Sequence, residues 1–434
     1  MTSSANDHRP QRPRQAGAHP APPAPRVRRP GRASLHALPP LAVALSALAL
    51  ISCVGAAGRP GAAGQSGGRS PAAPTTDASG SAGSPSAVTS PAALPNLTPA
   101  QKAGQRVIYS YSGLQPPATL LSWIRHGQVG GVIFFGGNIS SPAQIAGVIK
   151  QLDQANASAA NPLRAVPLLL MTAQEGGVVR RLPGRPFASE KQIGEEAHPA
   201  AAAKAAGTGA GQNLAGVGMN VNLAPVLDVY PTAGDFDDQF GRSYSTSPQV
   251  VSALGADFIK AQQATGVAAT AKHFPGLGAA SSTQDTDARP VTLNVGLHAL
   301  RTIDEYPYRA AIAAGVKLVM LSWAVYPALA RSTPAGLSSA VVNGELRDRL
   351  GFRGVTITDA LEAGALQAFG TTGHRATLAA RAGMDLILCS GQRASQGRLA
   401  RSALATALSS GALSASVFDA ALTRVIALRT GLRG

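Results

Sequence analysis

The sequence predicts a single (β/α)8 barrel of the TIM type over residues 97–434, preceded by a signal peptide and a disordered linker. The chain has 434 residues and 45% hydrophobic content, which is enough to bury a large core. From Leu97 onward, short apolar runs alternate with Ala-rich stretches long enough to form helices. The runs are continuously apolar, which is typical of parallel strands that are buried on both faces of a sheet.

The first element, residues 1–53, is expected to be a signal peptide. An Arg- and Pro-rich segment is followed by an apolar stretch at residues 41–51, which is shorter than the roughly 20 residues that a membrane-spanning helix needs. The stretch ends in Ser52-Cys53, which resembles a bacterial lipobox. We therefore expect export, with the protein either anchored to the cell membrane by a lipid on Cys53 or located in the extracellular space or cell wall. The alternative is an ordinary signal peptide with an incidental cysteine.

The second element, residues 54–96, consists mostly of Gly, Ala, Ser, Pro and Thr. Such a composition has too few large apolar side chains to form a core, so a flexible, disordered linker is predicted. It would hold the domain of residues 97–434 away from the membrane.

The barrel itself is predicted from eight apolar runs, each followed by a segment that can form a helix. A doubly wound sheet is the competing topology, but no Gly-rich phosphate-binding loop follows the first run. The eight runs are Arg106–Ser110, Gly130–Phe135, Pro167–Thr172, Met219–Val229, Val267–His273, Val316–Trp323, Gly354–Asp359 and Asp385–Ser390.

The charge and the cysteines exclude several classes of function. The formal charge is +16, but seven arginines and one aspartate precede Cys53, in the segment that export would remove. The other basic residues form no run typical of nucleic-acid binding, so no nucleic-acid partner is expected. The two cysteines, Cys53 and Cys389, indicate neither a disulfide framework nor a metal site. We expect a monomer without metal or cofactor.

Four of the predicted strands end in polar or aromatic residues that suit a reactive site. The third leads into Gln174-Glu175, the fifth into Lys272-His273, the sixth into Ser322-Trp323, and the seventh into Thr358-Asp359. One such end could be structural, for example an aspartate that caps the next helix. Because the carboxyl ends of all barrel strands meet at one face, four together predict a site there.

Several ordered motifs resemble the N-terminal barrel domain of glycoside hydrolase family 3, especially its bacterial β-N-acetylhexosaminidase branch. The resemblance runs from about Thr98 to Arg429 and leaves no room for the second domain of many β-glucosidases in the family. It therefore favours the single-barrel branch. The motifs are QEGG followed by Arg-Leu, NLAPVLDV at 222–229, GRSYSTSP at 241–248, KHFPG at 272–276 and LGFRGVTITDAL at 350–361.

The resemblance implies a retaining glycosidase that acts on a carbohydrate substrate. Asp359 occupies the place of the nucleophile, which forms a covalent glycosyl-enzyme that water later resolves. The expected activity is hydrolysis of terminal β-GlcNAc from cell-wall-type glycans such as peptidoglycan fragments. By the same resemblance, sugar hydroxyls or the N-acetyl group would be bound by Arg181, Arg242, Lys272 and His273.

The chain departs from the branch on the loop after KHFPG, where the general acid/base is an Asp-Ser-His dyad. The loop here reads Asp285-Thr286-Asp287, so Asp287 stands in the place of the histidine. Either Asp285 or Asp287 could be the acid/base, since most glycosidases use a carboxyl group for this task. Leu277 also replaces a histidine, and Ala173 replaces a sugar-binding aspartate.

These departures leave two alternatives open. The barrel could be a catalytically degenerate lipoprotein that binds glycan or envelope partners, or it could be a β-glucosidase-like hydrolase. Trp323 stands where a histidine is expected, and it could either stack on a sugar or plug the barrel mouth. Glu175, within QEGG, is expected to be structural rather than catalytic.

Overall fold

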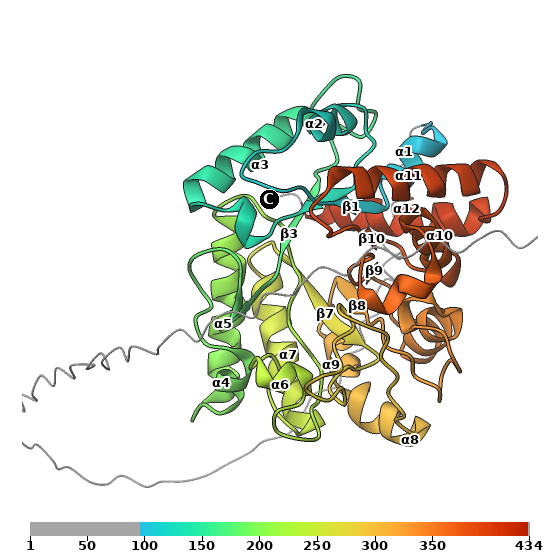
Figure 1. The fold of residues 1–434 in the computed structure, drawn as a ribbon. Helices are drawn as coiled ribbons and strands as arrows, with labels where there is room; N and C mark the ends of the chain where they lie inside the picture. The colour runs from blue at the N-terminus through green and yellow to red at the C-terminus, as the bar shows by residue number, and fades with distance from the viewer. Residues whose placement is uncertain (1–95, 433–434) are drawn as a thin grey trace, which may run out of the picture. The chain divides into compact units, whose positions relative to one another are not determined.

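The computed structural model describes residues 96–432, and eight parallel strands form a barrel within them (Figure 1). The expected signal peptide, Cys53 and all of the linker except Asn96 lie outside the described residues. No helix between residues 96 and 432 combines the length and the apolar character needed to cross a membrane.

The strands confirm the predicted barrel, and each coincides with one of the eight apolar runs. Parallel pairing joins them in the order β10-β1-β2-β3-β6-β7-β8-β9. A further parallel bridge between Ile357 and Leu386 closes the ring between β9 and β10. The bounds are β1 Val107–Tyr109, β2 Gly131–Ile133, β3 Leu169–Thr172, β6 Val221–Asn222, β7 Ala268–Phe274, β8 Leu318–Leu321, β9 Val355–Thr358 and β10 Ile387–Leu388. A small antiparallel hairpin of β4 (Gln174–Gly176) and β5 (Val179–Arg180) follows β3.

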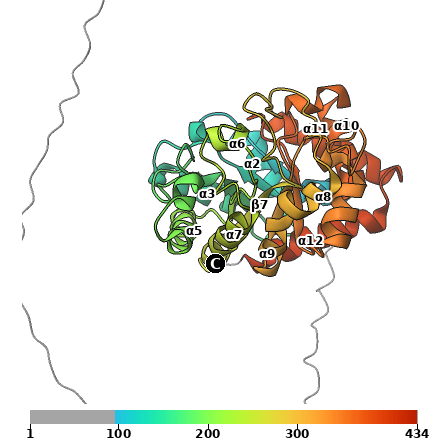
Figure 2. The same ribbon diagram turned by 90° about the horizontal axis from the view of Figure 1, so that it is seen from below.

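A helical segment follows each barrel strand and packs around the outside, as the view turned by 90° shows (Figure 2). After β1, β2, β3, β6 and β7 these segments are, in the same order, α2 (Ala118–Arg125), α3 (Pro142–Asn156), α5 (Pro199–Ala215), α7 (Pro248–Gln263) and α9 (Tyr306–Ala313). After β8, β9 and β10 they are the π-helix η4 (Ala340–Arg349), α10 (Thr372–Ala382) and α11 (Ala394–Ser409). The domain also contains α1 (Pro99–Gly104), α4 (Glu190–Gly194), α6 (Phe236–Gln239), α8 (Leu297–Ala299) and α12 (Ala415–Gly431).

Local sequence signals explain where the outer helices begin and how closely they pack. The Ser141 hydroxyl accepts from Gln144 N at the start of α3, and Ser247 caps α7 in the same way; a proline follows each serine. Gly207 of α5 lies against α7, where a Cβ atom would come within 2.4 Å of the Phe258 carbonyl oxygen. Glycine therefore permits the close approach of these two helices.

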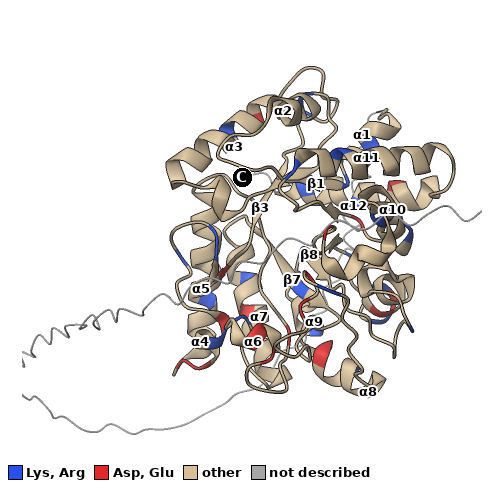
Figure 3. Cartoon of the chain, viewed as in Figure 1, with Lys and Arg blue, Asp and Glu red and all other residues tan. Residues whose placement is uncertain are grey.

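The apolar core has two layers, because successive strand residues point to opposite faces. One cluster contains buried side chains from the strands, such as Ile108, Met171 and Ile357. A larger cluster contains the alternate strand residues, such as Tyr109, together with side chains of the outer helices. Basic and acidic residues lie on many different elements of the described domain (Figure 3). The barrel is thus a packed scaffold whose strand ends can hold a site rigidly.

Candidate active site

A cavity of about 700 Å³ lies at the carboxyl ends of the barrel strands. Its lining includes Phe134, Ala173, His273, Asp359 and Ser390, each at or just beyond the end of a different strand. This is the face of a (β/α)8 barrel where substrates bind, because the loops after the strands surround it. The four strand ends singled out by their polar residues do meet at this face, although not all of their side chains enter the cavity.

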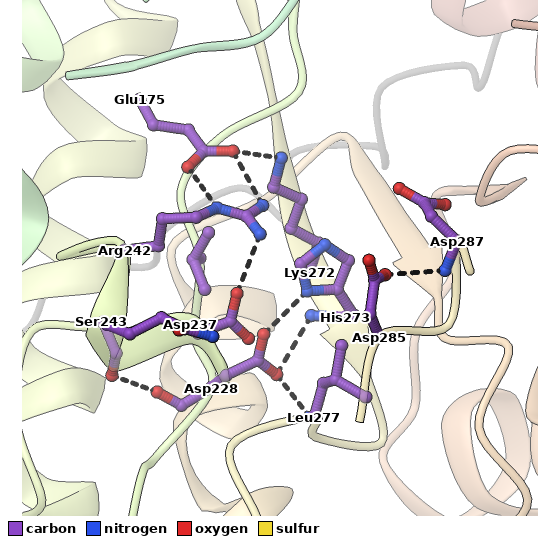
Figure 4. Close-up of polar contacts among 12 residues, drawn as sticks. Glu175, Asp228, Asp237, Arg242, Ser243, Lys272, His273, Leu277, Asp285 and Asp287 are labelled. Carbon is purple, nitrogen blue, oxygen red and sulfur yellow. Dashed lines mark hydrogen bonds and ion pairs between the residues drawn. The ribbon is translucent and has the colours of Figure 1, made fainter. Parts of the chain in front are cut away.

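One wall of the cavity is a buried network of opposite charges formed by Glu175, Arg242 and Lys272, here called the ion-pair wall (Figure 4). Arg242 donates from Nε to Glu175 Oε2 at 2.9 Å and from Nη2 to Oε1 at 3.1 Å. Lys272 Nζ donates to Glu175 Oε1 at 2.5 Å. Burial alone would raise the pKa of Glu175, but the two cations outweigh it and hold the pKa at about 2. Glu175 is therefore a permanent anion that fixes both cations.

His273 is fixed from behind by a second carboxylate. Its Nδ1 lies 2.7 Å from Asp228 Oδ2, while Asp228 Oδ1 accepts from Leu277 N at 2.6 Å. Burial, with help from Arg242 and Lys272, lowers the pKa of His273 to about 4 against the opposing effect of nearby carboxylates. The imidazole is therefore neutral at neutral pH, and a proton on Nδ1 leaves Nε2 as a hydrogen-bond acceptor.

The donor atoms of Asp228, Asp237 and His273 lie within 4.8 Å of one another, which is close enough for a metal ion. However, His273 Nδ1 already bonds Asp228, and Arg242 Nη1 donates to Asp237 Oδ1 at 2.8 Å. A metal ion here would lie beside a guanidinium cation and would have to break these bonds. The group therefore acts as a hydrogen-bonding support for His273 and Arg242.

Asp359 directly follows β9 and lines the same cavity. Its Oδ1 accepts from the backbone N–H of Ala360 at 2.7 Å. That bond fixes the carboxylate at the strand end. The arrangement suits a nucleophile, which needs one anionic oxygen held toward the substrate.

The loop of residues 285–287, here called the acid loop, brings Asp285 and Asp287 to the cavity. Asp285 Oδ1 accepts from the backbone N–H of Asp287 at 2.8 Å, so Asp285 shapes the loop (Figure 4). Asp287 is exposed at the cavity, but neighbouring protein atoms partly desolvate its carboxyl group and three other carboxylates lie close to it. Partial desolvation, then Asp359, Asp285 and Glu362, raise the pKa of Asp287 to about 7.

The acid loop is tied to the segment that follows Asp359. Gly364 N donates to Asp287 O at 2.7 Å, and Ala365 N donates to Thr286 O at 3.0 Å. A Cβ atom on Gly364 would come within 2.2 Å of the Ala288 carbonyl oxygen, so only glycine permits this contact. The same stretch of chain therefore positions both Asp287 and Asp359.

The cavity receives most of the residues that the sequence singled out, but not Trp323. Arg181, Arg242, Lys272 and His273 line it together with Asp285, Asp287 and Asp359. Trp323 is fully buried, does not line the cavity and donates from Nε1 to Ala360 O at 2.8 Å. The structure therefore places Trp323 in the core and not among the cavity-lining residues, where the expected contact with sugar would require it to be. The indole instead supports the segment beside Asp359.

Several cavity residues were not identified from the sequence. Glu362 lines the mouth, where its carboxylate accepts from Ser390 Oγ at 2.7 Å. Phe236 and Phe240 line another part of the cavity. Asp228, which supports His273 from behind the cavity, was not identified either; it lies within the NLAPVLDV motif, whose aspartate in an otherwise apolar run was the available signal. The phenylalanines carried no such signal, because their spacing also suits an ordinary buried helix face.

Comparison with known proteins places the chain among sugar hydrolases. A family model described as the glycosyl hydrolase family 3 N terminal domain matches residues 100–428. An uncharacterized secreted glycosyl hydrolase of Arthroderma benhamiae is 45% identical over 349 residues, covering 80% of this chain and 97% of that protein. A β-hexosaminidase of Xanthomonas oryzae pv. oryzae is 32% identical over 290 residues, covering 65% of this chain and 82% of that protein.

Solved structures agree with this assignment. A family 3 β-N-acetylglucosaminidase from Paenibacillus sp. has a TM-score of 0.73 and 36% identity, covering 78% of this chain and 64% of that chain. A β-N-acetylhexosaminidase from Beutenbergia cavernae has a TM-score of 0.69 and 30% identity, covering 77% of this chain and 99% of that chain. The chain thus spans somewhat less than two thirds of the first structure and nearly all of the second.

Proposed function

The chain belongs to glycoside hydrolase family 3, and on that premise we propose that it is an exported, retaining β-N-acetylhexosaminidase-like enzyme. It releases terminal β-GlcNAc from cell-wall-type glycans, with Asp359 as nucleophile and Asp287 as general acid/base. The observation that carries this proposal is that Asp359 and Asp287 line one cavity and are positioned by one stretch of chain.

The roles of the two carboxyl groups follow from their surroundings. Asp359 attacks the anomeric carbon while Asp287 protonates the departing glycosidic oxygen, and a covalent glycosyl-enzyme forms on Asp359. The Asp287 carboxylate then takes a proton from the water that resolves this intermediate. Its pKa of about 7 supports both steps, because an acid/base works best when its pKa lies near the operating pH. Asp285 has a positioning role, since its carboxylate holds the Asp287 backbone.

The remaining residues of the cavity suit a neutral sugar. Arg242 and Lys272 present fixed N–H donors, His273 offers an acceptor, and Arg181 lines the same cavity. Rigid donors can hold hydroxyl or N-acetyl oxygens in defined directions. The preference for β-GlcNAc is supported by relatives named β-hexosaminidase and β-N-acetylglucosaminidase. This mechanism uses no metal and no cofactor.

Export is supported by the leader-like residues 1–53 and by a 45% identical relative that is described as secreted. We propose that residues 54–96 tether the catalytic domain, residues 97–434, to a lipid on Cys53, and that the domain acts as a monomer. Replacing Cys53→Ala is expected to release the protein from the membrane fraction, and Cys389→Ala serves as the matched control. An unchanged distribution between membrane and soluble fractions would contradict the lipid anchor.

The proposed activity is tested with the purified protein and two nitrophenyl substrates, the β-GlcNAc and the β-glucoside. We expect release of nitrophenol from the first, a weaker rate with the second, and loss of both in Asp359→Asn. A higher rate with the glucoside would identify a β-glucosidase-like enzyme. Absence of turnover in a folded protein would favour the glycan-binding alternative.

A further inference from the structure

Two large apolar side chains are exposed inside the catalytic cavity. Among the described residues, Phe240 is 45% exposed and Val178 is 67% exposed, and both line the cavity. The proposed chemistry uses neither residue. Large apolar groups that stay exposed in a concave site commonly mark a surface that a ligand covers.

Phe240 is held by a second aromatic ring. Phe236, at the start of α6, also lines the cavity and packs against the main core. The Phe236 and Phe240 ring centroids lie 5.6 Å apart with the planes at 79°, a favourable edge-to-face arrangement. Phe236 therefore connects the exposed Phe240 ring to the core and supports it from one side.

The segment that carries the two rings is bonded to the chain leading into the acid loop. Phe236 N donates to Ala280 O at 2.8 Å, and Gln239 Nε2 donates to Ser282 O at 2.9 Å. Because the proposed acid protonates the departing oxygen, we expect groups beside its loop to lie nearer the leaving group than the sugar that Asp359 attacks. The cleaved sugar instead has the polar ion-pair wall available to it.

We propose that Phe240, supported by Phe236 and flanked by Val178, binds the leaving-group sugar of the substrate, the ring that departs when the glycosidic bond breaks. The ligand class is an uncharged pyranose, whose C–H face stacks on the aromatic ring. The inference rests on the proposed glycosidase function and extends it to a substrate of at least two linked sugars.

The experiment measures what the second sugar contributes, separately from catalysis. In the full chain carrying Asp359→Asn, calorimetric titration compares binding of the disaccharide GlcNAc-β-1,4-GlcNAc with that of methyl β-GlcNAc. We expect the disaccharide to bind about tenfold more tightly, which is the size of a single ring-stacking contact. Adding Phe240→Ala is expected to remove that gain and leave binding of the methyl glycoside within about twofold, while Phe240→Trp retains the gain.

Phe187→Ala is the matched control, because Phe187 is 62% exposed but does not line the cavity. It is expected to leave both affinities unchanged. The proposal is overturned if the disaccharide gains nothing over the methyl glycoside, or if the gain survives Phe240→Ala. Equal weakening of both ligands would also overturn it, since that result indicates a general disturbance of the loop. Turnover of nitrophenyl β-GlcNAc by the unmodified protein tests the proposed function independently of these results.

Discussion

The ion-pair wall and the acid loop line the same cavity, but their carboxylates have opposite kinds of charged neighbours. In the wall, Glu175 is surrounded by two cations and is buried. In the loop, Asp287 is exposed at the cavity and its charged neighbours are mainly further carboxylates. The two cations accordingly hold the pKa of Glu175 at about 2, whereas partial desolvation, together with the neighbouring carboxylates, raises the pKa of Asp287 to about 7.

The difference shows how one site can separate binding from proton transfer. Opposite charges at hydrogen-bonding distance fix geometry and remove any tendency to change protonation. Like charges near one another keep one carboxyl group protonated near neutral pH, as proton donation requires. If this division is correct, substitutions in the wall should affect stability and substrate binding, whereas substitutions in the loop should affect the proton-transfer steps of the reaction.

The largest effect on stability is expected from Glu175→Gln. It removes the anion between Arg242 and Lys272 and leaves the buried Lys272 and the partly buried Arg242 without their main partner, which typically costs about 3–5 kcal/mol. Urea unfolding of the variant measures this loss. The exposed Glu196→Gln should change the free energy of unfolding by less than about 0.5 kcal/mol. If Glu175→Gln and Glu196→Gln have equal free energies of unfolding, the ion-pair wall does not stabilise the fold as proposed.

Asp287→Ala should have the converse result, with little change in stability and a large loss of activity. General acid catalysis is expected to contribute about 10²–10⁴-fold with a disaccharide, whose leaving group is poor. With dinitrophenyl β-GlcNAc the first step needs little acid, so the loss of kcat/KM should be much smaller. Azide should restore turnover by attacking the glycosyl-enzyme. A loss that does not depend on the leaving group would rule out this role.

A smaller effect is expected at Asp285, because this residue acts through the position of Asp287. Asp285→Ala removes the acceptor of the Asp287 N–H, and we expect a roughly tenfold loss of kcat/KM with a disaccharide. Asp285→Asn retains an oxygen acceptor and should recover most of that loss. If the Asp285→Asn and Asp285→Ala variants are equally inactive even with dinitrophenyl β-GlcNAc, Asp285 itself takes part in the chemistry.

The smallest expected effect is a shift of the pH profile in Glu362→Gln. Asp287 must be protonated for the first step, so kcat/KM should fall as pH rises through its pKa of about 7. Glu362 is one of the carboxylates that raise this pKa, so its neutralisation should move the alkaline limb to lower pH. Glu196→Gln provides the charge-matched control. If the alkaline limb of the kcat/KM profile does not move in Glu362→Gln, the ionisation of Asp287 does not determine that limb.

The fold and part of the site could be predicted because both depend on local patterns. Eight apolar runs separated by helix-length segments determine the barrel, and parallel strands bring their carboxyl ends together at one face. The motif around Asp359 indicated a nucleophile at that face. These inferences need no knowledge of which way individual side chains point.

The remaining features depend on contacts between distant segments. The pKa of Asp287 is raised by partial desolvation and then by carboxylates such as Asp359 and Glu362, which lie far from it in the sequence. Trp323 lies beyond the regular part of β8, so strand alternation does not determine its direction, and the structure turns it into the core. The exposure of Phe240 likewise depends on how α6 meets the chain before the acid loop.

The central claim, that Asp359 and Asp287 form a retaining pair, is tested most directly by trapping the intermediate. In Asp287→Ala, dinitrophenyl β-GlcNAc should form the glycosyl-enzyme quickly, and hydrolysis should be slow because no base activates water. Rapid acid quenching, proteolysis and mass spectrometry should then find one N-acetylhexosamine on the peptide that contains Asp359. An adduct on another carboxylate would contradict the assignment of Asp359 as nucleophile. Rapid release of dinitrophenol with no adduct at all would contradict a covalent mechanism.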